Sequence, residues 1–198
     1  MKQLFLIFLG LSMFLFAHSQ NSQFPVNPDG AIEFTGSINT DLDVKQFFEE
    51  AKLWATGNRH IVVYENTESG TITLKCLVKG KTSYNPFAGQ FTESYDCVLK
   101  LTHKGENVDY SISDIYIINN YMGYGMSTTT TKVEEKVAEL EKTKADKSAA
   151  ESNTELSKKK RKDIIEDCDD AIATLTESLA VTKKFADDII ESLKVKFE

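Results

Sequence analysis

The stretch KCLVKGKTSYNPFAGQFTESYDCVLK, residues 75–100, is typical of a β-hairpin. Apolar residues recur at every second position on both sides of a central Pro-Phe-Ala-Gly turn, which places them on one face of each strand. These inward residues are Ile72, Leu74, Cys76 and Val78 before the turn, and Tyr95, Cys97, Leu99 and Leu101 after it. With the hairpin centred between Pro86 and Phe87, Cys76 lies opposite Cys97 and every inward residue meets an apolar partner. The pattern predicts that both cysteines lie in a hydrophobic core.

The residues around this hairpin extend the sheet. Alternation predicts five strands, at residues 31–38, 60–65, 71–79, 94–103 and 107–118. A helix lies between the first two strands, capped by Thr40 or Asp41 and stopped at Gly57. Its apolar stripe consists of Val44, Phe47, Phe48, Ala51 and Trp54. The prediction is an α+β fold with a five-stranded antiparallel sheet, one face of which is apolar and covered by helix.

The first 20 residues are typical of a bacterial export signal. Lys2 supplies a positive start, residues 4–16 are nearly all apolar, and small side chains at Ala17 and Ser19 suit cleavage before Gln20. The apolar run is shorter than the roughly 20 residues of a membrane span, and no second run follows it. We therefore expect an exported protein, periplasmic or extracellular, with no membrane span after signal cleavage.

Two interpretations of the Cys76 and Cys97 pair are open. Opposed residues of antiparallel strands have Cβ atoms about 4.5–5.5 Å apart, whereas a disulfide prefers about 3.8 Å, which favours neighbouring buried thiols. A disulfide is the alternative, because an exported chain meets an oxidising compartment. A metal site is not expected, since His103 lies about 20 Å along the strand from Cys97 and the sequence has no CxxC pair.

The amino-acid composition of the chain changes near Met126. All ten glycines and all three prolines lie before this residue, whereas the remainder is rich in Lys, Glu, Asp and Ala. Capping-box patterns that begin at Thr131 and Ser152 predict helices at about residues 132–150 and 154–197. The predicted domains are a signal peptide at 1–19, an α+β sheet domain at 20–126 and a helical tail at 127–198.

An apolar seam runs along the second predicted helix. It repeats at steps of three and four residues through Ile165, Cys168, Ile172, Leu175, Leu179, Thr182, Ala186, Ile189 and Leu193. A helix of about 40 residues is about 60 Å long, so we expect only residues 179–197 to pack behind the sheet. An intramolecular core stripe is favoured over a coiled-coil dimer, because Thr182 and Ala186 weaken the seam. A partner would be an unknown envelope protein, or a second copy bound through the helical tail.

The charge of the chain argues against nucleic-acid binding. The net charge is −7 and the first half has no basic patch, whereas nucleic-acid phosphates demand clustered Lys and Arg side chains.

Four segments carry a resemblance to a known family: DGAIEFTGSI, FFEEAKLWATGN, YENTESGTITLKCLVKG and YSISDIYI. Together they resemble exported proteins of Bacteroidetes-type bacteria described as a domain of unknown function with a TATA-binding-protein-like fold. The resemblance implies a curved antiparallel sheet backed by two helices, in the order strand, helix, four strands, helix. The last of these helices must come from the helical tail.

The sequence carries no catalytic, cofactor or metal-binding signature, and we expect no cofactor. The leading interpretation is a noncatalytic binding or assembly module of the bacterial envelope. One alternative is a carrier of small apolar ligands with a pocket between sheet and helices, its lip formed by Tyr121, Met122, Tyr124 and Met126. A hydrolase is less favoured, because no motif organises its candidate acids and bases, which are Asp96, Asp114 and His103.

Overall fold

A computed structural model describes residues 24–85, 89–122 and 125–198 of the chain. The signal peptide expected at residues 1–19 lies outside the described residues. The described part forms strands β1 (Phe34–Asn39), β2 (Ile61–Asn66), β3 (Thr71–Asn85), β4 (Gly89–His103), β5 (Asn107–Met122) and β6 (Met126–Lys132). It also forms helices α2 (Val44–Gly57), α3 (Val133–Ser152) and α4 (Lys158–Phe197).

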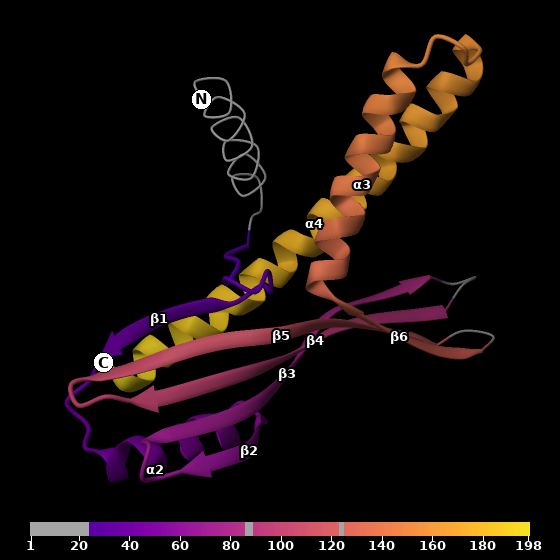
Figure 1. The fold of residues 1–198 in the computed structure, drawn as a ribbon. Helices are drawn as coiled ribbons and strands as arrows, with labels where there is room; N and C mark the ends of the chain where they lie inside the picture. Colours follow the sequence, from indigo (N-terminus) through magenta and orange to yellow (C-terminus); the bar gives the residue numbers. More distant parts are fainter. Residues whose placement is uncertain (1–23, 86–88, 123–124) are drawn as a thin grey trace, which may run out of the picture.

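The strands form one antiparallel sheet in the order β1-β5-β4-β3-β2 (Figure 1). β1 and β6 both pair with β5, β1 with residues 107–112 and β6 with residues 116–122. The α+β class and antiparallel sheet predicted from the sequence are confirmed, and β6 adds a sixth strand. Residues 126–132, which we assigned to the boundary and start of the helical tail, therefore belong to the sheet.

The register of the central hairpin follows the predicted parity. Cys76 pairs with Cys97, Leu74 with Leu99 and Val78 with Tyr95. Beyond Lys79 the register shifts by one residue, so that Thr82 pairs with Thr92 and Asn85 pairs with Gly89. β3, β4 and β5 are longer than predicted. The sequence pattern missed the added residues, because they are exposed or half-buried and carry no apolar alternation.

The helix caps differ from those predicted. Asp43 caps α2, because its carboxylate accepts a hydrogen bond from the Gln46 N–H at 2.8 Å and the Gln46 side chain accepts one from the Asp43 N–H at 3.0 Å. Thr40 lies before the helix, and its backbone N–H donates to the Glu106 carbonyl at 2.9 Å. α4 begins after Ser157, which accepts a hydrogen bond from the Lys160 N–H.

The capping boxes predicted for the tail do not form. Thr131 lies in β6 opposite Ile117, and α3 begins after Lys132 without a side-chain cap bond. Ser152 ends α3, and its hydroxyl donates back to the Ser148 carbonyl at 3.0 Å. The sequence pattern alone does not distinguish these positions from true helix starts, because the same residue types favour caps and turns.

One face of the sheet is covered by two helices that lie side by side. α2 buries Phe47, Phe48, Ala51, Trp54 and Ala55, and the second half of α4 buries Leu175, Leu179, Thr182, Phe185, Ala186, Ile189, Leu193 and Phe197. The two helices touch directly, since the Phe47 and Phe197 rings lie 5.7 Å apart and Lys196 forms an ion pair with Glu50. These side chains and the inward residues of the strands form a single hydrophobic core.

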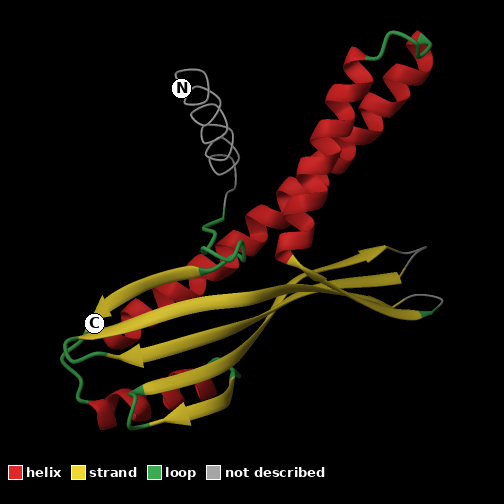
Figure 2. Cartoon of the chain, viewed as in Figure 1, coloured by secondary structure: helices red, strands yellow, loops and turns green. Residues whose placement is uncertain are grey.

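The first half of α4 projects from this core and packs along α3 (Figure 2). Val133, Leu140 and Ala150 of α3 are buried, and Lys147 of α3 forms an ion pair with Asp169 of α4 at 2.7 Å. Ile165, Cys168 and Ile172 are half-buried beside α3. The seam of α4 is therefore covered within the chain. Among the described residues, no helix combines the length and apolar character that a bilayer span requires.

We predict that Leu193→Ala lowers the free energy of unfolding by about 2–5 kcal/mol, because it opens a cavity under a side chain that is 0% exposed. Val195→Ala is the matched control on the same helical turn, and it should change the free energy by less than about 0.5 kcal/mol, since Val195 is 88% exposed. Urea unfolding followed by circular dichroism measures both. Equal effects of the two substitutions would contradict this packing of α4.

Candidate functional site

A pocket of about 610 Å³ opens between the end of α2, the edge of β3 and the second half of α4. We call it the α2–β3–α4 pocket. It is lined by Trp54, Asn58, Arg59, His60, Leu77, Val78, Lys79, Gly80, Tyr95, Val181, Lys184, Phe185, Asp188, Ile189 and Ser192. Most of the lining is apolar, and the charged side chains come from the ends and exposed faces of their elements.

The pocket exists because two elements end early. α2 stops at Gly57, and β2 pairs with β3 only as far as Lys75. Among the residues that the structure describes, the edge of β3 from Leu77 to Gly80 therefore has no strand partner on the β2 side. α4 passes behind this edge and closes the third side.

Three aromatic rings form the inner wall. The Tyr95 ring stacks on the Phe185 ring with centroids 5.3 Å apart and planes 22° apart. The Trp54 indole N–H donates to the Ser192 hydroxyl at 2.8 Å, which ties α2 to α4. A Cβ atom at Gly80 would lie 2.7 Å from the Tyr95 ring, so glycine at this position lets the ring approach the strand. The wall is therefore held in place by packing and by one partly buried hydrogen bond.

Tyr95 is a neutral wall residue. Burial raises the pKa of its hydroxyl, and so does Glu93, whose carboxylate accepts a short hydrogen bond from this hydroxyl. A phenol whose pKa is raised in this way stays protonated at physiological pH and cannot act as a base.

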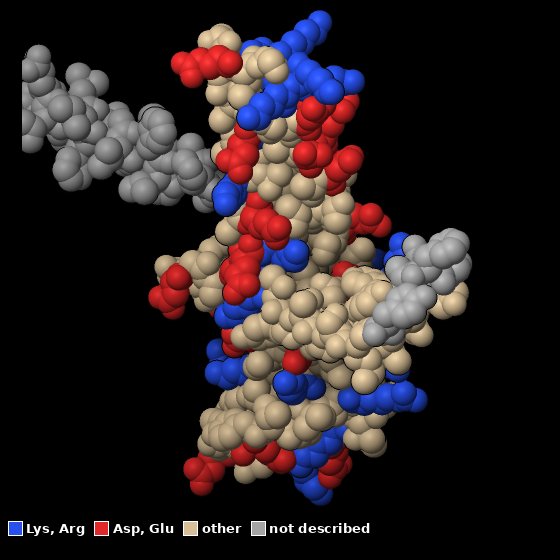
Figure 3. Space-filling model, turned by 90° about the vertical axis from the view of Figure 1, so that its right-hand side faces the viewer, with Lys and Arg blue, Asp and Glu red and all other residues tan. Residues whose placement is uncertain are grey.

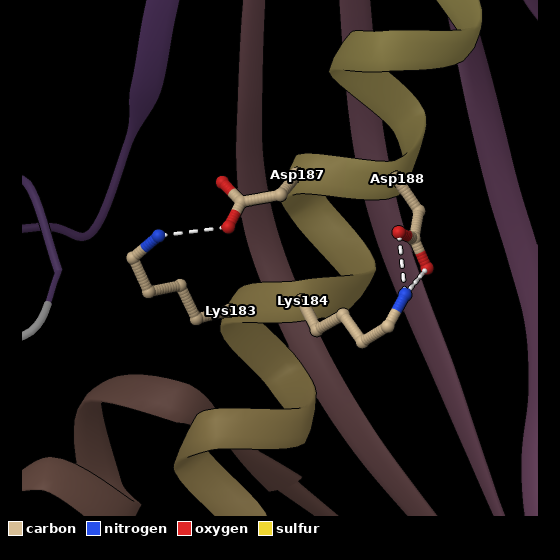
Figure 4. A network of polar contacts seen from close by, with 4 residues as sticks. All are labelled: Lys183, Lys184, Asp187 and Asp188. Atoms are coloured by element: carbon tan, nitrogen blue, oxygen red, sulfur yellow. Dashed lines mark hydrogen bonds and ion pairs between the residues drawn. The ribbon is translucent and has the colours of Figure 1, made fainter.

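The mouth of the pocket carries four charged side chains. Both carboxylate oxygens of Asp188 accept from the Lys184 ammonium at 2.6 Å, an i,i+4 pair on α4 (Figure 4). The next pair along the same helix, Lys183 with Asp187 at 2.8 Å, points to the other side of α4 (Figure 4). The remaining two charges at the mouth are cationic, and they belong to Arg59 and Lys79.

The cysteine pair lies behind the pocket wall. Cys76 and Cys97 are free thiols that face one another across β3 and β4, and each is no more than 1% exposed. A hydrogen bond from the Cys97 thiol lowers the pKa of Cys76, and the neighbouring His60 imidazole acts in the same direction. The same pairing, together with burial, raises the pKa of Cys97. Cys76 is therefore the more acidic thiol of the pair, although neither thiol lines the pocket.

The candidate acids and bases named from the sequence do not line the pocket, and each makes a contact elsewhere in the fold. Asp96 forms an ion pair with Lys75 at 2.9 Å, and Asp114 forms one with Lys132 at 3.0 Å. A ring nitrogen of His103 lies 2.8 Å from the Leu42 carbonyl oxygen. Within residues 24–85, 89–122 and 125–198, no group of three His, Cys, Asp or Glu side chains is placed to hold a metal ion.

The predicted pocket lip lies elsewhere on the sheet. Tyr121 and Met122 end β5 and pair with Ser127 and Met126 of β6. None of them lines the α2–β3–α4 pocket. Tyr124 lies outside the described residues.

The sequence did offer a signal for part of this pocket. Val181, Phe185 and Ile189 recur at steps of four residues. Val181 and Phe185 each directly precede a residue of the predicted seam. This second apolar stripe on α4 indicates that the helix contacts more than the sheet core. No comparable signal marks Asn58, Arg59 or His60, which lie in the connection between α2 and β2.

No family model and no curated protein matches the sequence. Two solved structures do match the fold. A DUF4468 family protein from Bacteroides ovatus is 18% identical with a TM-score of 0.56, over 88% of this chain and 90% of that chain. A TBP-like protein from Parabacteroides distasonis is 19% identical with a TM-score of 0.40, over 82% of this chain and 96% of that chain.

The first of these matches shows that the two chains share a fold, and at this identity it shows nothing about ligand or activity. The description of the first structure, a DUF4468 family protein from a Bacteroides species, agrees with the resemblance noted from the sequence to Bacteroidetes-type proteins with a domain of unknown function.

We predict that Cys76 and Cys97 are unbridged in the purified protein. Denaturation in iodoacetamide without reductant should then add three labels to the intact mass, one for each cysteine of the chain. In the native protein only the half-buried Cys168 should react quickly. A denatured protein that takes up a single label would show that Cys76 and Cys97 form a disulfide.

Proposed function

We propose that the chain is an exported, noncatalytic binding module of the bacterial envelope, and that the α2–β3–α4 pocket holds its ligand. The pocket itself carries this proposal. Its volume of about 610 Å³ falls within the range of about 300–1,000 Å³ that is typical of small-molecule sites. The proposal of export rests on the signal-like composition of residues 1–19.

The lining suits an apolar ligand. The buried rings of Trp54, Tyr95 and Phe185 form the inner wall. Leu77 and Val181 add aliphatic surface that is 51% and 38% exposed. Apolar surface left open to water in a concave site favours binding of an apolar body, because its burial is worth about 25 cal/mol per Å². The few polar groups at the mouth would orient the ligand.

Two observations support a binding role over catalysis. Tyr95 is kept protonated, and Lys184 and Asp188 neutralise one another at 2.6 Å. His60 also lies in the wall, and the Cys76 thiol beside it is buried. The Ser192 hydroxyl, the one aliphatic alcohol among the lining residues, accepts from the Trp54 indole N–H at 2.8 Å and so belongs to the contact between α2 and α4.

A small ligand is also better supported than assembly through the helical tail. The seam of α4 is covered by α3 and by the sheet, so it leaves no long apolar stripe for a second helix. Figure 3 shows acidic and basic side chains interspersed along the projecting helices, which is typical of a solvated surface.

We predict that a neutral apolar probe, N-phenyl-1-naphthylamine, binds at one saturable site and quenches Trp54, the single tryptophan of the chain. Val181→Phe fills the mouth of the pocket and should weaken binding by about tenfold or more, because the larger side chain occupies ligand volume. Fluorescence titration of the mature protein measures both effects.

Val195→Phe is the matched control, since Val195 lies on the same helix but is 88% exposed and does not line the pocket. It should leave the affinity unchanged. The proposal fails if the probe gives no saturable quenching, or if Val181→Phe binds it as tightly as the unsubstituted protein.

A further inference from the structure

The mouth of the α2–β3–α4 pocket is positively charged, although the chain as a whole has a net charge of −7. Arg59, Lys79 and Lys184 are cations at the mouth, and Asp188 is the single carboxylate among the lining residues. A concave site with low-dielectric walls concentrates the field of such charges. The surplus of positive charge therefore attracts anions to this site, although the net charge of the chain is negative.

Two of these cations lack a partner. Lys184 is neutralised by both oxygens of Asp188 (Figure 4). Among the described residues, neither Arg59 nor Lys79 has a carboxylate oxygen within 4.0 Å, so no ion pair neutralises either charge. The two side chains come from different elements, one from the connection after α2 and one from β3.

The backbone of Arg59 adds a second, independent observation. Its φ angle is 61°, in the left-handed region, two residues after the end of α2. Glycine is the usual residue in this conformation after a helix, because a side chain is disfavoured there. This conformation belongs to the end of α2, where the Arg59 N–H donates to the Thr56 carbonyl at 3.2 Å and the His60 N–H donates to the Ala55 carbonyl at 2.8 Å, so the helix ending fixes the point from which the side chain extends. Here that side chain is a guanidinium at the mouth of an apolar pocket.

The edge of β3 offers neutral donors as well. Residues 77–80 line the pocket and have no strand partner on the β2 side in the described part of the chain, so main-chain N–H groups on that side lack a ladder acceptor. Main-chain N–H groups and a guanidinium together suit the oxygens of a carboxylate or a phosphate.

We infer that the ligand of the pocket is an amphiphile with an apolar body and one anionic group, a carboxylate or a phosphate. The apolar body lies against Trp54, Tyr95 and Phe185, and the anionic group lies between Arg59 and Lys79. This inference rests on the proposed function, because it requires that the pocket binds a ligand at all.

The test compares three ligands with the same 12-carbon chain by Trp54 fluorescence: dodecanoate, dodecyl phosphate and dodecanol, each kept below the concentration at which it forms micelles. At low salt, at least one of the two anions should bind about tenfold or more tightly than dodecanol. This advantage should shrink as salt is added, because the charges at the mouth are exposed and screened. The tighter of the two anions identifies the head group.

Two substitutions assign the effect to the cations. Arg59→Gly should reduce the advantage of the anion by about tenfold, and it should also raise the Tm by about 2–4 °C, because it relieves the left-handed backbone. A protein that becomes more stable while it loses anion binding has not simply misfolded. Lys79→Gln should reduce the advantage to a similar degree. Lys81→Gln is the matched control, since it removes the same charge from an exposed position on β3 outside the pocket.

The outcomes separate the two proposals. If dodecanol binds as tightly as both anions, the pocket is a ligand site but the inferred charge preference is wrong. If no ligand saturates, the inference and the proposed function both fail. If an anion is preferred but Arg59→Gly and Lys79→Gln leave the preference intact, the assignment to these cations is wrong.

Discussion

The structure depends on the burial of one apolar sheet face beneath α4. α2 is too short to cover this face alone, since its 14 residues span about 21 Å, and β3, β4 and β5 are each longer. The second half of α4 supplies the missing cover with a continuous row of buried side chains that ends at Phe197. The same row places Phe185 on Tyr95 and Ser192 on Trp54, so the core and the pocket wall arise from one packing interaction.

The sequence predicted the strands in which apolar and polar residues alternate. Cys76 faces Cys97 because a strand with one buried face admits a single register. β6 was missed because Ser127–Thr131 contains no apolar residue, and its strand conformation comes from pairing with β5. The cap of α2 was predicted at Thr40 or Asp41, whereas Asp43 and Gln46 form it at capping-box spacing, a local signal that the prediction did not use.

The candidate site was harder to predict than the fold. Trp54 and Ser192 are 138 positions apart, and their contact depends on where α4 crosses the sheet. The aromatic and methionine residues near Tyr121 suggested a lip, but these residues pair with β6 instead. The φ angle of Arg59 is set by the geometry of the connection between α2 and β2, and residue type alone gives no indication of it. Sites that join distant segments in this way escape sequence patterns.

The most direct test of the central claim is the unfolding of a chain that ends at Ser178. The account predicts that this shortened chain loses the cooperative urea transition, because the apolar sheet face is left open to water when Leu179, Phe185 and Leu193 are removed. Trp54 fluorescence and circular dichroism should then change gradually and independently. A single cooperative transition, with a midpoint and m value close to those of the full chain, would contradict the claim.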